Sequence, residues 1–243
     1  MYVLHVLNLS DGSVIWSQTE KHSTSDWEDA NGVAVDGSGL YVVGDDNIPG
    51  NHEWRIEKRN PVLPGLWVLG IPLVQGWNLI SLPVVPVSSA PKVALATVMA
   101  AGNVTVVWSY TGTPTPTWKS FNPALTSGNT LTAVTDGMGL WVLMKAAGTL
   151  YAEGYVIPPA GSPSQYPLVA GWNLVGFKPI PDPSAPETVG TYLTSLPGGS
   201  FDANNVWLYD NPTGVWTRTN SGTSITPGQA LWILMLAPAK LAP

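Results

Sequence analysis

Gly76-Trp77-Asn78-Leu79-Ile80 occurs a second time, 95 positions further along the chain, as Gly171-Trp172-Asn173-Leu174-Val175. A similar Pro-Leu-Val-x tetrapeptide precedes each copy, at 72–75 and at 167–170. A self-match at a fixed distance is the signature of an internal repeat, and a missed repeat gives a wrong fold. The chain therefore contains a duplicated unit.

The match between the copies extends well beyond this pentapeptide. Ser-Ala-Pro at 89–91 recurs at 184–186, and the distance between matched segments drifts between 91 and 99 positions. Four tryptophans per copy fall in matched positions: Trp77, Trp108, Trp118 and Trp141 against Trp172, Trp207, Trp216 and Trp232. Because these are eight of the twelve tryptophans, we expect Trp to serve mainly in building two similar cores.

Each copy has the pattern of one strand, one short helix and then several strands. The segments 77–82 and 172–177 alternate apolar and polar residues, as half-buried strands do. Ser89 and Ser184 are favoured helix N-caps, each followed by a proline in the first turn. The nearly continuous apolar run at 139–144 is typical of a central buried strand.

These patterns predict a strand-dominated α+β fold. Two tandem repeats, 65–160 and 161–243, follow an N-terminal segment, 1–64, of different composition. Residues 1–60 hold ten of the sixteen acidic residues, four of the ten basic residues and all three histidines. The remainder is nearly uncharged, so two kinds of module share one chain.

The N-terminal segment consists of strand-like runs joined by glycine-rich turns, at 8–16, 31–44 and 53–59. Over most of residues 8–60 this segment resembles the repeats of β-propeller proteins, in which a hairpin like the one at 32–44 is followed by a variable loop and another strand. A propeller needs roughly four to eight blades, whereas this segment supplies an incomplete, propeller-like part. Two interpretations remain open: the chain is a fragment that begins inside a larger protein, or the strands form a small sheet that packs on the first repeat or on another copy.

The doubled unit resembles the Gly-Trp-Asn-Leu repeat domains found near the C-termini of large secreted or surface-anchored proteins of bacteria and archaea, over residues 67–243. The matching residues are Gly76–Leu79 with Leu140–Val142, and Gly171–Leu174 with Leu231–Ile233. The resemblance implies a non-catalytic surface or adhesion role. We expect an extracellular or cell-surface location, with polysaccharide or a surface protein as partner. Residues 1–9 lack the features of a signal peptide, so we expect that signal upstream of this chain.

Composition narrows the possible functions. The chain has no cysteine, which excludes disulfides and thiolate chemistry. Neither part has a basic stripe, so we expect no nucleic-acid partner. No apolar run approaches about 18 residues, so we expect no membrane span. The spacing of histidines and acids matches no metal motif, and no phosphate-binding glycine loop is present, so we expect neither a metal nor a cofactor.

The acidic residues are the first candidates for chemistry. Glycoside hydrolysis uses two carboxylates that flank the scissile bond, and Asp45, Asp46 and Glu53 in the N-terminal segment are candidates for that role. The competing interpretation, which we favour, is that they are solvated acids of loops and turns. The three histidines lack the context of a nucleophile and base pair. The prediction therefore leans against an enzyme.

Aromatic residues are the stronger candidates. Trp118 and Trp216 stand among polar residues, and Tyr110 and Tyr209 lie on the preceding predicted strands. One interpretation places these rings over a small core, and the other makes them a ligand surface for sugars. We predict a binding or adhesion module. The alternatives are a glycosidase-like hydrolase that uses the N-terminal carboxylates, or a structural subunit that self-associates through open strand edges.

Overall fold

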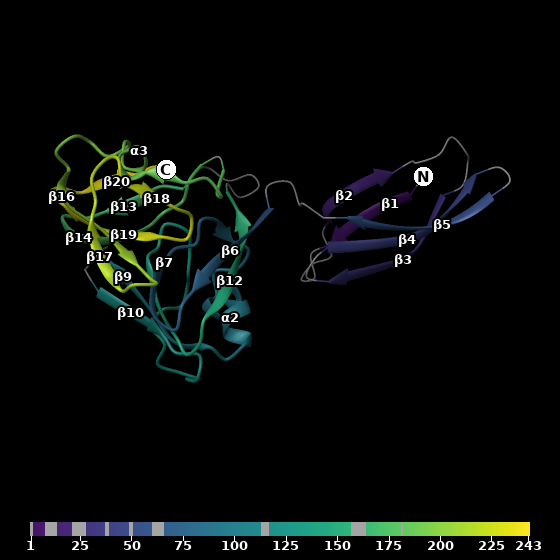
Figure 1. Cartoon of the computed structure of the whole chain (residues 1–243), viewed down its shortest axis with the longest axis horizontal. Helices are drawn as coiled ribbons and strands as arrows, with labels where there is room; N and C mark the ends of the chain where they lie inside the picture. The colour runs from purple at the N-terminus through teal and green to yellow at the C-terminus, as the bar shows by residue number, and fades with distance from the viewer. Residues whose placement is uncertain are drawn as a thin grey trace. The chain divides into compact units, whose positions relative to one another are not determined.

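A computed structural model describes residues 2–7, 14–20, 28–36, 39–48, 51–59, 66–112, 117–156, 164–180 and 182–243, with side chains from residue 66 onward. The chain divides into two compact units, Met1–Pro64 and Gly65–Pro243. Strands dominate both units, and the helices are few and short (Figure 1). The strand-dominated α+β fold class is therefore confirmed.

The N-terminal unit is built from antiparallel strands. Its elements are β1 (Tyr2–Leu7), β2 (Val14–Glu20), β3 (Glu28–Asp36), β4 (Gly39–Ile48) and β5 (Asn51–Arg59). β1 pairs with β2, and β3, β4 and β5 form a three-stranded meander. Strands therefore stand where the hairpin at 31–44 and the strand at 53–59 were predicted. The likeness to a propeller blade remains a prediction.

The first repeat forms a four-stranded antiparallel sheet in the order β10-β9-β11-β7 and a second sheet in the order β6-β12-β8. Its elements are β6 (Leu66–Leu73), β7 (Gly76–Ile80), β8 (Val85–Pro86), α1 (Pro91–Ala94), α2 (Ala96–Ala100), β9 (Val104–Thr111), β10 (Thr117–Phe121), β11 (Leu140–Met144) and β12 (Gly148–Tyr155). The apolar run at 139–144 therefore supplies a central strand, β11, as predicted.

The second repeat has the same sheet in the order β14-β19-β16-β17, with β13-β20 and β15-β18 as smaller pairs. Its elements are β13 (Tyr166–Leu168), β14 (Gly171–Gly176), β15 (Glu187–Thr188), α3 (Val189–Tyr192), β16 (Phe201–Asp210), β17 (Val215–Arg218), β18 (Ser224–Ile225), β19 (Ala230–Met235) and β20 (Ala239–Leu241). β20 pairs with β13 as β12 pairs with β6. This pairing gives the C-terminal strand a partner on one of its edges.

The Gly-Trp-Asn motif forms the turn that begins β7 and β14. Gly76 and Gly171 both have φ of 98°, a conformation that favours glycine. The buried Asn78 side chain accepts a hydrogen bond from the Val74 N–H at 2.9 Å and donates to the Val74 carbonyl at 2.8 Å. Asn173 makes the same two bonds to the backbone of Val169, at 3.1 and 2.7 Å. The glycine and the asparagine of the motif therefore form the same turn in both copies.

Each repeat has its own aliphatic core. One cluster joins β6, β7, β9, β11 and β12 with the two short helices, and the other joins the equivalent strands with α3. Four apolar residues in α3 and in the turn that follows it are buried in the second cluster: Val189, Tyr192, Leu193 and Leu196. None of the eight matched tryptophans belongs to either cluster. The expectation that they build the two cores was wrong, because they lie on the opposite faces of the sheets.

The predicted helix caps were also wrong. Thr188 caps α3 by accepting a hydrogen bond from the Thr191 N–H, whereas Ser184 bonds to Asp182. α1 begins after Ala90, with no side-chain cap. Ser89 uses its backbone carbonyl to accept a hydrogen bond from the Val134 N–H instead.

The two repeats pack against each other through reciprocal contacts. The Ser81 N–H donates to the Gly228 carbonyl at 2.8 Å, and the equivalent Gly176 N–H donates to the equivalent Gly137 carbonyl at 2.9 Å. A Cβ on Gly228 would meet Ile71, and a Cβ on Gly137 would meet Tyr166, the counterpart of Ile71. Reciprocal contacts of this kind define an approximate two-fold relation between the repeats.

Candidate functional site: two aromatic pockets between the repeats

The strands of each repeat carry apolar side chains on both faces of the sheet. In β11 the side chains of Leu140, Val142 and Met144 are buried, whereas Trp141 and Leu143 are only partly buried. Successive residues of a strand point to opposite faces. One face therefore covers the aliphatic core, and the other carries aromatic rings.

Cross-strand pairing extends the aromatic side across the whole sheet. Trp141 lies opposite Leu79 of β7 and Trp108 of β9. Tyr110, two residues after Trp108, shares its face and lies opposite Trp118 of β10. The second repeat has the same arrangement: Trp232 opposite Leu174 and Trp207, and Trp216 opposite Tyr209. We call these two surfaces the aromatic faces.

The aromatic faces meet through two equivalent ring contacts, each between a tyrosine of one repeat and a tryptophan of the other. The ring centroids of Tyr110 and Trp232 are 5.1 Å apart, and those of Tyr209 and Trp141 are 4.9 Å apart. Such separations are typical of favourable aromatic pairs. Three buried side chains fill the centre of the contact: Leu79, Leu174 and Ala230. The interface between the repeats is therefore a third hydrophobic cluster, made jointly by both copies.

Two open pockets flank this contact. The first-repeat pocket has a volume of about 600 Å³ and is lined by Trp77, Trp108, Trp118, Trp141, Tyr209, Gly214 and Trp216. The second-repeat pocket has a volume of about 590 Å³ and is lined by Tyr110, Trp118, Trp172, Trp207, Trp216 and Trp232. Each aromatic residue of one pocket has its repeat counterpart in the other. The chain thus duplicates an open surface pocket of ligand-binding size, and Trp118 and Trp216 contribute to both copies.

The pockets are lined mainly by flat apolar rings, whose indole and phenol groups carry hydrogen-bond donors at their edges. Trp77 and Trp172 are 41% and 40% exposed, and Trp118 and Trp216 are 45% and 41% exposed. Within the described part of the chain, the indole N–H groups and the hydroxyls of Tyr110 and Tyr209 make no hydrogen bond. The lining residues are all uncharged. These surfaces fit a neutral ligand that has apolar faces and polar edges.

The structure brings together all four aromatic residues that were predicted as a ligand surface. Trp118 and Trp216 line both pockets, and Tyr110 and Tyr209 line one each. Sequence reasoning missed the other six tryptophans, which it assigned to the cores. For Trp108 and Trp207, a signal is the Trp-x-Tyr spacing in β9 and β16, which puts two rings on one face of a strand.

The candidate carboxylates lie in the N-terminal unit. Asp46 stands opposite Glu53 in the backbone register of β4 and β5, and Asp45 stands opposite Trp54. Their side chains lie outside the described residues, so the hydrolase interpretation remains an untested prediction.

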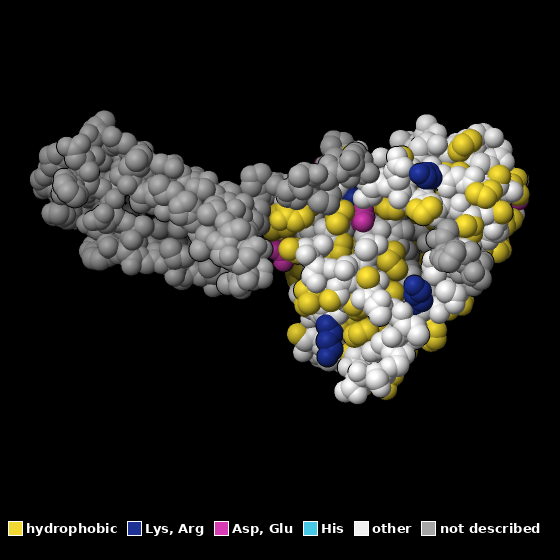
Figure 2. Space-filling view, turned by 180° about the vertical axis from the view of Figure 1, so that it is seen from behind, with side chains coloured by type: hydrophobic (Ala, Val, Ile, Leu, Met, Phe, Trp, Pro, Cys, Tyr) yellow, Lys and Arg dark blue, Asp and Glu magenta, His cyan; other side chains and the backbone are white. Residues whose placement is uncertain are grey.

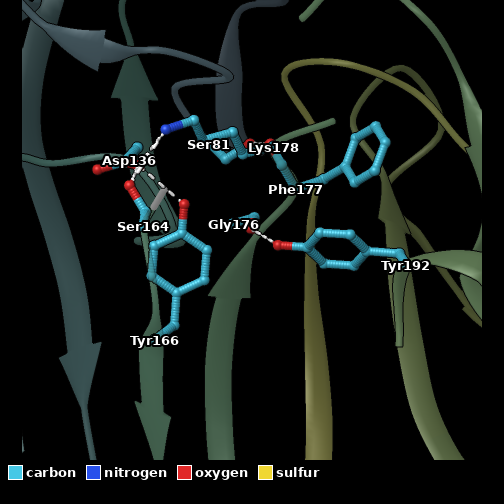
Figure 3. A network of polar contacts seen from close by, with 8 residues as sticks. All are labelled: Ser81, Asp136, Ser164, Tyr166, Gly176, Phe177, Lys178 and Tyr192. Atoms are coloured by element: carbon cyan, nitrogen blue, oxygen red, sulfur yellow. Dashed lines mark hydrogen bonds and ion pairs between the residues drawn. The ribbon is translucent and has the colours of Figure 1, made fainter. Parts of the chain in front are cut away.

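A buried polar cluster also joins the two repeats (Figure 3). Lys178 is fully buried, and its Nζ lies 2.6 Å from Oδ2 of Asp136. The same carboxylate oxygen accepts hydrogen bonds from the hydroxyls of Ser164, at 2.5 Å, and Tyr166, at 2.8 Å. Asp136 belongs to the first repeat and the other three residues to the second. The cluster is therefore a polar clamp across the interface of the repeats.

The clamp has the residue types of a nucleophilic site but not the arrangement. Ser164 Oγ lies 3.2 Å from Lys178 Nζ, yet its proton points to Asp136. A lysine paired with a carboxylate is an ammonium, which has donors and no acceptor for the serine proton. Burial, and then the nearby Asp136 charge, raises the pKa of Tyr166 well above its ordinary value, so its hydroxyl stays a donor. We therefore assign the clamp a structural role.

The described residues contain no cluster of three or more His, Cys, Asp or Glu suited to a metal ion. None of the described helices has the length and apolar character to cross a membrane. On the face drawn in Figure 2, charged side chains of the described unit are few and well separated. Comparisons with protein-family models, with curated proteins and with solved structures found no match.

Proposed function

We propose that the Gly65–Pro243 unit is a non-catalytic carbohydrate-binding module whose ligand sites are the two aromatic pockets. The observation that carries this proposal is the duplication of one complete set of aromatic walls around two cavities of nearly equal volume. A pyranose ring presents C–H groups on its faces, which pack on the electron-rich face of an indole. Rigid indole and phenol rings lose little conformational entropy when they bind a ligand.

The polar atoms of the pockets favour a sugar over a purely apolar ligand. Sugar hydroxyls at the rim of the ring would accept hydrogen bonds from the indole N–H groups, which bond to none of the described residues, while an alkyl chain would not pair with these donors. Tyr209 places its hydroxyl next to Gly214, at the wall of the first-repeat pocket. Because none of the described residues that line the pockets is charged, a neutral polysaccharide fits better than an anionic one.

We further propose that the chain is part of a secreted or surface-anchored protein and acts there in attachment. The low charge of the repeat unit and the resemblance to Gly-Trp-Asn-Leu repeat domains support this placement. Uncharged aromatic pockets suit a polysaccharide outside the cell as the partner. The carboxylates of the N-terminal unit have no part in this proposal.

The test is retention of the full chain on insoluble cellulose, chitin, xylan and mannan, followed by titration with the hexasaccharide of the polymer that retains it. The double variant Trp118→Ala/Trp216→Ala removes a wall from both pockets. We expect at least about a thirtyfold loss of affinity, because truncation of a Trp or Tyr hot spot costs about 2 kcal/mol or more. Thermal unfolding of the variant checks that the fold persists.

The matched control is Tyr151→Ala on β12. Tyr151 is an aromatic side chain that is 54% exposed and lines neither pocket. The control should retain the glycan like the unchanged chain. Equal loss in the control, or retention of poly-L-proline or choline in place of every glycan, would refute the carbohydrate proposal.

A further inference from the structure

The approximate two-fold relation between the repeats also relates the two pockets. Trp77 and Trp108 in the first-repeat pocket have Trp172 and Trp207 as their counterparts in the second. Across the interface, Trp118 lies 6.0 Å from Trp232, and Trp216 lies 5.9 Å from Trp141, as ring centroids. The two cavities therefore present the same groups in two-fold related orientations.

This symmetry limits how one polysaccharide could use both pockets. A sugar chain has a direction, because its reducing and non-reducing ends differ. A straight chain passing through both pockets would cross the two-fold axis, and the rotation would then reverse its direction between one pocket and the other. A chain parallel to the axis keeps its direction under the rotation, but a chain seated in one pocket lies off the axis, so the equivalent site in the other pocket takes a different segment. Equivalent binding in both pockets therefore requires two separate chain segments.

We propose that the module holds two carbohydrate segments, one in each pocket, and so joins two polysaccharide chains. This inference rests on the carbohydrate-binding function proposed above. It adds the number of carbohydrate segments bound per protein chain, which is two, and the consequence that two polysaccharide chains are joined. Two sites on one rigid body increase avidity for a surface only when both can be occupied together. A module with this geometry bridges neighbouring chains of a polysaccharide network.

Two single substitutions separate the pockets. Trp77 lines only the first-repeat pocket and Trp172 only the second, and their exposed fractions are 41% and 40%. Trp77→Ala and Trp172→Ala therefore form a matched pair that removes the same wall from one pocket at a time. Trp118 and Trp216 are unsuitable for this purpose because each of them lines both cavities.

The experiment has two readouts on the full chain. Calorimetric titration with the retained hexasaccharide should give about two ligands per unchanged chain and about one per single variant. Beads coated with the same polysaccharide should agglutinate with the unchanged chain, while each single variant should bind the beads without agglutinating them. Light scattering of the free protein checks that agglutination does not come from self-association, which would overturn the bridging inference.

The outcomes are distinguishable. If no member of the glycan panel binds, the proposed function itself fails. If binding occurs with about one ligand per unchanged chain, or if both single variants still agglutinate beads, the carbohydrate function stands and the two-segment inference is wrong. Should either alanine variant unfold, Trp77→Phe and Trp172→Phe keep an aromatic wall of reduced area and should lower the affinity of one site only.

Discussion

At the residue scale, each of the three residues in the repeated Gly-Trp-Asn motif has a different role. The glycine allows the positive φ of the turn, and the buried asparagine bonds to the backbone four residues earlier. The tryptophan faces the other way and forms a pocket wall. Residues that form the turn and a residue of the candidate site therefore stand next to each other in one motif. The sequence pattern alone does not distinguish the two roles.

Gly171→Ala tests the conformational role of the glycine. A Cβ at Gly171 would meet nothing within 4 Å, so only its φ of 98° opposes the change. An alanine in a left-handed conformation costs about 1–2 kcal/mol, and we expect a loss of that size in the free energy of unfolding from urea titration. Gly198→Ala is the control, since its Cβ also meets nothing within 4 Å and its φ is not positive. Equal stability of the two variants would contradict this explanation.

At the element scale, the sequence predicts which residues of a strand share a face of the sheet. It does not predict what each face of the sheet packs against. The predicted strands that carry Tyr110 and Tyr209 are present as β9 and β16. Alternation shows which residues share a face. It does not show that one apolar face meets its own helix and the other meets the second repeat, because that contact joins segments about a hundred positions apart. For this reason six of the tryptophans that line the pockets were assigned to the cores.

Gly176→Ala tests how tightly the two repeats dock at the end of β14. A Cβ on Gly176 would lie 2.6 Å from the Met138 carbonyl oxygen and 2.7 Å from Cβ of Ser81, which is its counterpart in the first repeat. Only one of the two equivalent positions can therefore carry a side chain. Overpacking of this kind costs typically about 1–3 kcal/mol, and we expect a lower melting temperature in calorimetry.

Gly222→Ala is the matched control for this change, because the nearest atom to its Cβ would be 3.4 Å away, on the Asn220 side chain. It should melt close to the unchanged chain. A Gly176→Ala variant as stable as this control would mean that the repeats can move apart at β14 without cost, and that their contact is looser than the hydrogen bonds across it indicate.

At the scale of the whole molecule, the two-fold relation is broken by the polar clamp. The counterparts of Asp136 and Lys178 are Pro227 and Pro83, so the symmetric position carries neither charge. The repeats therefore dock at one end through an ion pair and at the other without one. A buried pair is weak support for stability, because the desolvation of both charges opposes their attraction. The pair therefore need not be the main source of affinity between the repeats.

A double-mutant cycle separates these contributions. Asp136→Ala leaves the buried Lys178 ammonium without its carboxylate, and we expect a loss of about 3–5 kcal/mol. Adding Lys178→Met removes the stranded charge, so the double variant should be more stable than Asp136→Ala alone, as measured by urea unfolding followed through tryptophan fluorescence. Lys92→Met, at an exposed helical position, controls for the replacement itself. Additive losses in the cycle would show that the two charges act independently, which their 2.6 Å separation does not allow.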